Sequence, residues 1–427
     1  MKTAAVICEY NPFHFGHRYQ IDTIKRTFGS DCRVIAIMSG CFTQRGEPAI
    51  FDKYTRAESA LRCGCDLVLE LPLPHSMSGA DFFARAGVYI ASSIGVVDLL
   101  FFGSECGELA RLQTVAERMS SNEFRQACAE ARVTDKGAQT GRLRDEIYRR
   151  LWGDEPILSG SNDLLALEYL RALNRFGSAI QPYAVKRVGG EYNSTDMPTG
   201  ISTGEMSESS FGTNTSLDKR TAPLPRFASA TAIRNAILSG SILSDGELMD
   251  LLPDKSAELA RREIESGRIH SLSKLDKIVS AFIRLRGQDF DNCIEGSASI
   301  GARLRKAAAE YSTVDDIVDA SVERRYSASR VRRVLLGGML GIKMSDCDEL
   351  PAYTNLLGAN AVGRELLAEI RKTSRLPVVT RISEIKSLGE RARAQLELEK
   401  RAAGLYALSC DAPQSPADIL RSRPVMV

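Results

Sequence analysis

Short apolar runs alternate with segments of helical periodicity along the first quarter of the chain, and no other feature constrains the fold as much. The runs are Thr3–Cys8, Arg33–Met38, Asp66–Leu71 and Val97–Phe102, and the helical segments between them are His17–Phe28, Lys53–Arg62 and Ala80–Ser93. Strands that alternate with helices form βαβ units, whose strands run parallel in one sheet. We therefore predict an α/β fold with a Rossmann-like parallel sheet, and we expect ligands beyond the carboxyl ends of its strands.

The rest of the chain reads as mainly helical. Helices are expected at Glu108–Trp152, Asn162–Arg175 and Ala230–Leu238, and one further strand is expected at Ile180–Val188. The segment Gly189–Phe227 is rich in Gly, Ser, Thr and Asn, and it is either an ordered substrate loop or a mobile lid. Strand signals nearly vanish from Asp245 onward. We therefore predict two domains, a catalytic α/β domain over residues 1–240 and a mainly helical domain over residues 245–427.

Composition excludes a general polyanion binder. Lys plus Arg number 56 and Asp plus Glu 54, so the net charge is only +2, and a nucleic-acid site must come from local clustering of charge. The ten cysteines are scattered and no secretory leader precedes them, so we expect a cytoplasmic protein with reduced thiols. Only Cys63 and Cys65 form a close pair, and no metal site is predicted. The longest apolar stretch, Ala86–Phe102, is too short and polar to cross a bilayer.

The loop after the first predicted strand contains the pattern His-x-Gly-His at residues 14–17. Gly16 lets the backbone approach a ligand closely, and the free N–H groups at the start of the following helix face an anion. Two imidazoles at this point can grip a triphosphate and stabilise charge as pyrophosphate leaves. His14 and His17 are therefore predicted catalytic residues for nucleotidyl transfer. The alternative is a helix cap beside a packed histidine.

A second polar segment, Ser229–Arg234, follows the Gly/Ser-rich stretch and opens a helix. We predict that Ser229, Thr231 and Arg234 close on the ATP phosphates, although either hydroxyl is also a plausible N-cap. Lys53 and Arg45 follow the second strand in a polar loop, where they are candidates to hold phosphate or another small anion. A solvated surface pair is the alternative for these two.

Positive charge gathers in one part of the helical half. The cluster consists of Arg324, Arg325, Arg330, Arg332 and Arg333, with Tyr326 among them. The apolar Val331, Val334 and Leu335 supply an inward side, so the arginines are expected to face outward, and Tyr326 is a candidate to stack on a base. A helix with arginines on one face is often only a solvated face. In a chain with so little net charge, we favour RNA contact.

Several stretches together resemble the bacterial tRNA(Met) cytidine acetate ligases, which belong to the HxGH nucleotidyltransferase superfamily. The matching stretches are residues 9–14, 38–40, 44–49 with Lys53, 78–81, 102–105, 162–163, 168–170, 186–187, 229–234, 325–327 and 335–342. The resemblance covers most of the chain. Departures occur in Gly189–Phe227, which lacks an expected tyrosine-histidine turn, and before Asn162, where Gly160-Ser161 stands in place of a proline.

The resemblance implies an activity and a site. Such enzymes join acetate to ATP, release pyrophosphate, and transfer the acetyl group from acetyl-adenylate to N4 of the wobble cytidine of elongator tRNA(Met), forming N4-acetylcytidine. The implied ATP site comprises Ile7, Cys8, Glu9, Tyr10, Asn11, Pro12, Phe13, His14, Phe15, Gly16, His17, Arg18, Tyr19, Gln20, Gly103, Asn162 and Arg187. Mg²⁺ is expected with ATP, and no tightly bound cofactor is expected.

Two other functions remain open from the sequence. An adenylyltransferase of coenzyme synthesis shares the His-x-Gly-His chemistry but normally needs no large arginine-bearing helical domain. A catalytically dead RNA-binding scaffold would keep the fold, although intact His14, Gly16, His17 and Arg234 argue against it. No linear motif identifies the acid, the tRNA, a general base or the oligomeric state.

Overall fold

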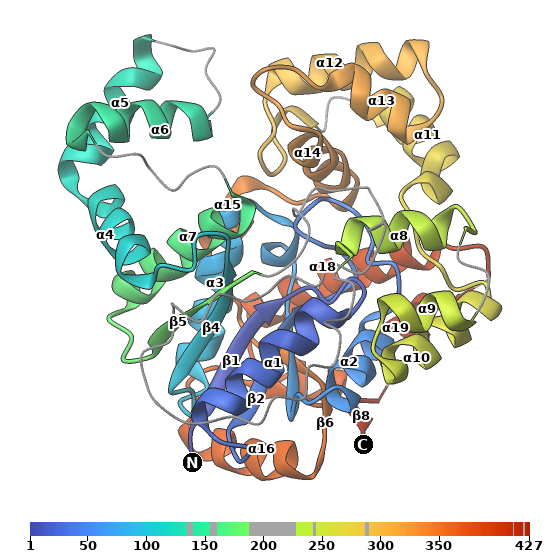
Figure 1. The fold of residues 1–427 in the computed structure, drawn as a ribbon. Helices are drawn as coiled ribbons and strands as arrows, with labels where there is room; N and C mark the ends of the chain where they lie inside the picture. The colour runs from blue at the N-terminus through green and yellow to red at the C-terminus, as the bar shows by residue number, and fades with distance from the viewer. Residues whose placement is uncertain are drawn as a thin grey trace.

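The computed structural model describes residues 1–134, 140–153, 160–187, 228–241, 245–286, 290–412, 414–421 and 423–427. The predicted loop Gly189–Phe227 lies outside these residues. An eight-stranded sheet, covered by helices on both faces, forms the centre of the molecule (Figure 1). Its strands are β1 (Thr3–Cys8), β2 (Arg33–Ser39), β3 (Leu67–Leu71), β4 (Leu99–Ser104), β5 (Gln181–Lys186), β6 (Thr354–Ala359), β7 (Val378–Val379) and β8 (Val425–Met426). The predicted α/β class is confirmed.

The strand order is β5-β4-β1-β2-β3-β6-β7, and β8 also pairs with β6. The five strands from β5 to β3 run parallel, whereas β6 pairs antiparallel with β3. Val6 of β1 stands opposite Ala36 of β2 on one side and Phe101 of β4 on the other. The carboxyl ends of five parallel strands therefore meet at one edge of the sheet, where ligands of such folds bind.

Helices of the first half cover both faces of the sheet. They are α1 (Phe15–Phe28), α2 (Lys53–Arg62), α3 (Ala80–Ser93), α4 (Leu109–Ser120), α5 (Asn122–Thr134), α6 (Thr140–Trp152), α7 (Ser161–Phe176) and α8 (Ala230–Leu238), with the 3-10 turn η1 (His75–Met77). Alternate strand residues face opposite layers: Ile35 and Ile37 pack with α3 and α7, while Val34 and Ala36 pack with α1 and α2. Burial on both faces explains why the predicted runs are mainly apolar and do not alternate apolar and polar residues.

The second half is mainly helical, as predicted. Its helices are α9 (Asp245–Leu251), α10 (Asp254–Glu265), η3 (Ser273–Leu275), α11 (Asp276–Arg286), α12 (Ala298–Glu310), α13 (Val314–Ser321), α14 (Ala328–Leu340), α15 (Met344–Asp348), α16 (Ala361–Thr373), α17 (Ile382–Ile385), α18 (Glu390–Ala407) and α19 (Pro416–Arg421). Residues of both halves share cores. Leu356 and Leu366 lie in the same apolar cluster as α3, and Phe42 and Met77 pack among α11–α14. The two-domain division at residues 240–245 therefore stays a prediction.

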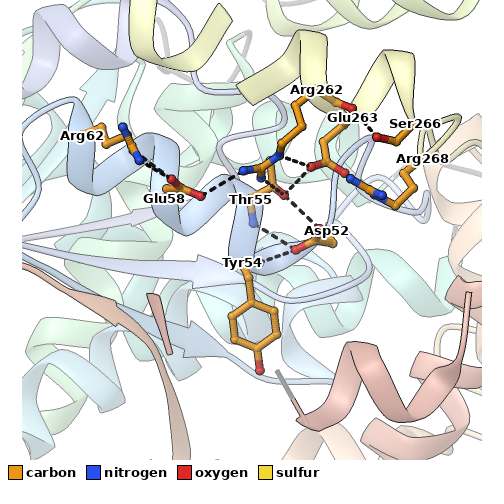
Figure 2. A network of polar contacts seen from close by, with 9 residues as sticks. All are labelled: Asp52, Tyr54, Thr55, Glu58, Arg62, Arg262, Glu263, Ser266 and Arg268. Carbon is orange, nitrogen blue, oxygen red and sulfur yellow. Dashed lines mark hydrogen bonds and ion pairs between the residues drawn. The ribbon is translucent and has the colours of Figure 1, made fainter. Parts of the chain in front are cut away.

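Polar contacts also join α10 of the second half to α2 of the first (Figure 2). Glu263 is buried, and its carboxylate accepts hydrogen bonds from Thr55 Oγ1 at 3.2 Å, Arg262 Nε at 3.0 Å and Arg268 Nε at 2.7 Å. Asp52 caps α2 by accepting from the backbone N–H groups of Tyr54 and Thr55. A buried carboxylate satisfied by several donors holds the two elements in one register.

None of the helices in the described part of the chain is both long enough and apolar enough to cross a membrane.

Candidate active site

The loop between β1 and α1 holds the two motif histidines in contact. His14 is the N-cap of α1: its Nδ1 accepts from the Gly16 backbone N at 3.0 Å, and His17 Nδ1 accepts from the His14 backbone N at 3.3 Å. The imidazoles stack with their centroids 3.8 Å apart. Because α1 begins at this cap, it starts at Phe15, two residues before the predicted start.

Burial keeps both imidazoles neutral. Burial, together with the Arg187 and Arg234 guanidinium groups, lowers the pKa of His14 to about 3. The pKa of His17 falls well below its ordinary value because of burial, the adjacent His14 and Arg187. Since each Nδ1 accepts a hydrogen bond, the single proton of each neutral ring is on Nε2. The pair therefore offers two N–H donors to a ligand without adding charge.

Three separate elements fix the β1–α1 loop. Asn11 Oδ1 accepts from the Ile50 backbone N at 2.7 Å, and the Asn11 carbonyl accepts from Arg234 Nη1 at 3.0 Å. Ser256 Oγ of α10 donates to the Phe13 carbonyl at 2.8 Å. The histidines are thus held on a loop whose backbone groups are already bonded, and such prior positioning favours catalysis.

A pocket opens beyond the carboxyl ends of β1, β4 and β5, and most predicted site residues line it. These are Ile7, Cys8, Glu9, Tyr10, Asn11, His14, Gly16, His17, Tyr19, Gln20, Gly103, Asn162, Arg187, Ser229, Thr231 and Arg234. Cationic side chains dominate its polar lining, namely Arg45, Lys186, Arg187 and Arg234. Such a lining suits a polyanion such as a triphosphate.

Helix α8 closes one side of this pocket. Ser229 caps it by accepting from the Ala232 backbone N at 3.1 Å, so the N-cap alternative for Ser229 is present in the structure. Thr231 Oγ1 accepts from Arg45 Nη1 at 3.2 Å, and Arg234 lies 3.8 Å from Glu47. The two arginines thereby tie α8 to the loop after β2 at the pocket.

The opposite side of the pocket is built on β4, α7 and β5. Asn162 Nδ2 donates to Glu105 Oε1 at 2.6 Å, and Arg187 Nη1 donates to Asn162 Oδ1 at 3.4 Å. A Cβ on Gly103 would meet Arg187 Cγ at 3.6 Å, an ordinary van der Waals distance, so Gly103 lies directly beside the arginine. The structure therefore brings these three predicted ATP-site residues together from separate segments.

Five predicted residues do not line the pocket: Pro12, Phe13, Phe15, Arg18 and Lys53. Phe13 is only 1% exposed and packs in the core beneath the loop. Arg18 points to the surface, where its Nε is 2.9 Å from Asp22 Oδ1. Core packing thus accounts for the position of Phe13, and a surface ion pair accounts for that of Arg18.

Lys53 lies apart from the histidines, beyond β3. Its Nζ is 2.8 Å from Glu70 Oε2, and both side chains are 5% exposed. Burial opposes the charge on Lys53, but the Glu70 carboxylate outweighs it and raises the pKa of the lysine. Lys53 borders a different cavity, which Asn355 and Glu399 also line. The solvated-pair alternative is wrong for Lys53, and the predicted catalytic role has no support from its position.

The arginine cluster of the second half turns largely inward. Arg332 Nη1 is 2.7 Å from Glu47 Oε1, and Arg333 Nη2 is 2.7 Å from Glu295 Oε2. Arg330 donates to the Glu295 carbonyl at 3.0 Å, and Tyr326 is 5% exposed. The expectation that these arginines face outward is wrong for Arg332 and Arg333, because the Gln44–Glu47 loop packs against α14. Arg324 and Arg325 remain exposed.

Sequence reasoning missed part of the pocket. Gln44 and Lys186 line it, as do the apolar side chains Phe83, Phe102, Leu165, Tyr169 and Val185. It also missed Arg56, which is 1% exposed and donates to the Glu9 carbonyl at 2.6 Å and the Ser39 carbonyl at 3.0 Å. Only tertiary packing reveals that Arg56 joins the ends of β1 and β2.

Comparison with known proteins assigns this chain to a family. A family model described as HIGH nucleotidyl transferase matches residues 1–208 and 213–418. A tRNA(Met) cytidine acetate ligase of Acetivibrio thermocellus is 34% identical over 422 residues, which cover 96% of this chain and 95% of that protein. The chain belongs to the tRNA(Met) cytidine acetate ligase family. The resemblance predicted from the sequence is confirmed.

Other members of the tRNA(Met) cytidine acetate ligase family agree. The protein of that name from Caldanaerobacter subterraneus is 32% identical, over 96% of each chain. The crystal structure of Thermotoga maritima TmcAL bound with alpha-thio ATP matches with a TM-score of 0.85 and 29% identity, over 100% of this chain and 99% of that one. Its apo form matches with a TM-score of 0.87. The likeness therefore extends over both halves of the fold.

Proposed function

We propose that this chain activates acetate with ATP and transfers the acetyl group to N4 of the wobble cytidine of elongator tRNA(Met). In the first step an acetate oxygen attacks the α-phosphorus of ATP, and pyrophosphate leaves. In the second step the cytidine amine attacks the acetyl carbonyl, and AMP leaves. The observation that carries the proposal is the cationic pocket with its neutral histidine pair, in a chain 34% identical over nearly its full length to a tRNA(Met) cytidine acetate ligase.

The pocket supplies suitable groups for the first step. The Nε2–H donors of His14 and His17 would bind phosphate oxygens as negative charge builds up on the departing pyrophosphate. Arg45, Arg187 and Arg234 would neutralise the phosphates and draw in acetate, as in other phosphoryl transfers. The apolar wall formed by Phe102, Leu165 and Val185 would give the adenine ring a surface to pack on.

Mg²⁺ would enter with ATP rather than reside in the protein. Within the described residues, no group of three or more His, Cys, Asp or Glu side chains is placed to hold a metal ion. With ATP, phosphate oxygens and water are the usual ligands of Mg²⁺. The site of action would be the cytoplasm, where ATP and tRNA occur together.

The tRNA would contact the exposed arginines of the second half. Arg324 and Arg325 are the members of the predicted cluster that remain exposed, and they precede α14, which packs on the loop carrying Arg45. Replacing both with glutamate should raise the KM for tRNA and reduce its salt dependence, with acetate-dependent exchange unchanged. An unchanged KM would remove these residues from the proposed surface.

The deciding experiment is ATP–pyrophosphate exchange with purified protein, with and without acetate and without tRNA. Acetate-dependent exchange followed by transfer of labelled acetate to tRNA(Met), but not to a tRNA with another anticodon, would support both steps. Exchange with a different acid would keep the mechanism and change the substrate. No exchange with any acid, even with tRNA present, would refute the adenylate mechanism.

A further inference from the structure

One carboxylate stands in a pocket that otherwise favours anions. Among the described residues that line the pocket, Glu9 is the only acidic one, whereas Arg45, Lys186, Arg187 and Arg234 are cationic. Acetate and ATP are both anions, so a carboxylate at this place hinders their binding. Its presence is better explained by a substrate group that carries a proton to be removed.

The geometry leaves one oxygen of Glu9 available to a substrate. Glu9 directly follows β1, and its Oε1 accepts from the Gln44 backbone N at 2.8 Å. Arg56 holds the Glu9 carbonyl, which fixes the backbone at this point. No hydrogen bond from the described residues reaches Oε2. The carboxylate is therefore oriented by one oxygen while the other remains open to a ligand in the pocket.

The two histidines are poorly suited to accept a proton. Each Nδ1 already accepts from a backbone N–H, and each Nε2 carries the proton of a neutral ring. The low pKa of His14, about 3, makes it a weak base. Burial instead raises the pKa of Glu9, against the opposing effects of the Gln44 hydrogen bond and of Arg45, Arg234 and Arg56. A raised pKa brings a carboxylate closer to the range that suits a general base.

We propose that Glu9 is the catalytic base of the transfer step, an inference that rests on the proposed function. Its Oε2 accepts a hydrogen bond from the exocyclic amine of the incoming cytidine, a contact that carboxylates make with this base. As the amine nitrogen forms its bond to the acetyl carbon, the bond from that carbon to the AMP oxygen breaks. The electron pair leaves with AMP, the amine proton passes to Glu9, and Glu9 later releases it to water.

The test separates the two chemical steps in Glu9→Gln, which keeps the size and one carbonyl oxygen of the side chain. Adenylate formation moves no proton to the enzyme, so acetate-dependent exchange should lose far less than the transfer step does. Single-turnover transfer from preformed acetyl-adenylate to tRNA should fall by about 10²–10⁴-fold. The wild-type transfer rate should rise with pH as Glu9 ionises, and this rise should be missing in the variant.

Two controls keep the result interpretable. Hydroxylamine needs no protein base, so the yield of acetohydroxamate per acetyl-adenylate formed should be the same in wild type and Glu9→Gln. Asp22→Asn removes an exposed carboxylate from α1 outside the pocket and should change neither step.

Two outcomes would overturn the assignment. Equal losses in exchange and transfer would mean that Glu9 serves ATP or its metal ion, and unchanged transfer would mean that it has no role in proton removal. Failure of the wild-type protein to exchange with acetate would instead count against the proposed function itself.

Discussion

Two groups of polar side chains lie at the carboxyl ends of the parallel strands, and they differ in how their charges are compensated. Beyond β1 and β4, Arg187 and Arg234 line a cavity beside two neutral histidines. At the carboxyl end of β3, beside β6, the buried Lys53 and Glu70 neutralise each other at 2.8 Å. The difference shows that position at this edge of the sheet does not identify a catalytic residue. What distinguishes the first group is that its charges face a cavity able to hold a substrate.

The largest expected effect is on the folded state, at Lys53. Lys53→Met leaves Glu70 buried without its cation, which should lower the free energy of unfolding by about 3–5 kcal/mol in denaturant titrations. Adding Glu70→Gln removes the buried charge and should restore much of that loss. Exchange activity of the folded fraction should stay close to wild type. A stable Lys53→Met protein without exchange would instead restore the catalytic role predicted from the sequence.

Substitution of His14 should reduce exchange activity strongly and stability only slightly, the reverse of the pattern expected for Lys53. His14→Ala removes a donor to the developing phosphate charge and should slow acetate-dependent exchange by about 10²–10³-fold. The variant also loses the N-cap of α1, which costs about 1 kcal/mol of stability. His14→Asn separates the two effects, because its side-chain oxygen restores the cap without restoring the imidazole. Recovery of exchange in His14→Asn would reduce His14 to a structural cap.

The same histidine predicts a pH dependence. Since the pKa of His14 is about 3, the ring is neutral well below physiological pH. Between pH 5 and 8 its protonation therefore contributes no change in the exchange rate. A loss of exchange centred near pH 6.5 that disappears in His14→Asn would contradict the neutral state inferred from the structure.

Substitution of Arg45, a pocket cation, should reduce exchange less than substitution of His14 does. Arg45→Met removes a cation from the pocket and the hydrogen bond to Thr231 that ties α8 to the loop after β2. Exchange should fall by roughly 10-fold, chiefly through a higher KM for ATP or acetate. Arg62→Met is the matched control, because Arg62 pairs with Glu58 on the surface of α2 (Figure 2) and should leave exchange unchanged.

The first strands and the motif loop could be predicted from the sequence because their information is local. Thr3–Cys8 and Lys53–Arg62 match β1 and α2 residue for residue. An apolar run between helical segments defines a buried parallel strand, and His14 and His17 lie three residues apart. In contrast, β6 was missed, because Thr354–Ala359 stands alone among helices and becomes a strand only by pairing with β3.

The remaining errors concern partners that are distant in sequence. Periodicity correctly buries Val331 and Val334 in α14, but it cannot show that Arg332 meets Glu47, 285 positions away. Lys53, predicted in the polar loop after the second strand, is the first residue of α2, and its partner Glu70 is the one charged residue in the otherwise apolar β3. Long-range ion pairs thus decided which predicted cations reach the pocket.

The smallest expected effect concerns Glu399, which lines the same cavity as Lys53. Burial and the nearby Glu70 raise the pKa of Glu399 to about 7, above the value of about 4.3 for an unfolded glutamate. The folded state therefore binds the extra proton, so this group's contribution to stability is present at pH 4 and is lost as pH rises to 7. Glu399→Gln should raise the free energy of unfolding at pH 8 and have little effect at pH 4. Glu397→Gln, exposed on the same helix, should show no such pH dependence. Equal destabilisation by Glu399→Gln at both pH values would mean that this carboxylate is ionised in the folded state at pH 4 as well as at pH 8. Lys53, Glu70 and Glu399 would then carry a net charge together, as the pocket residues do.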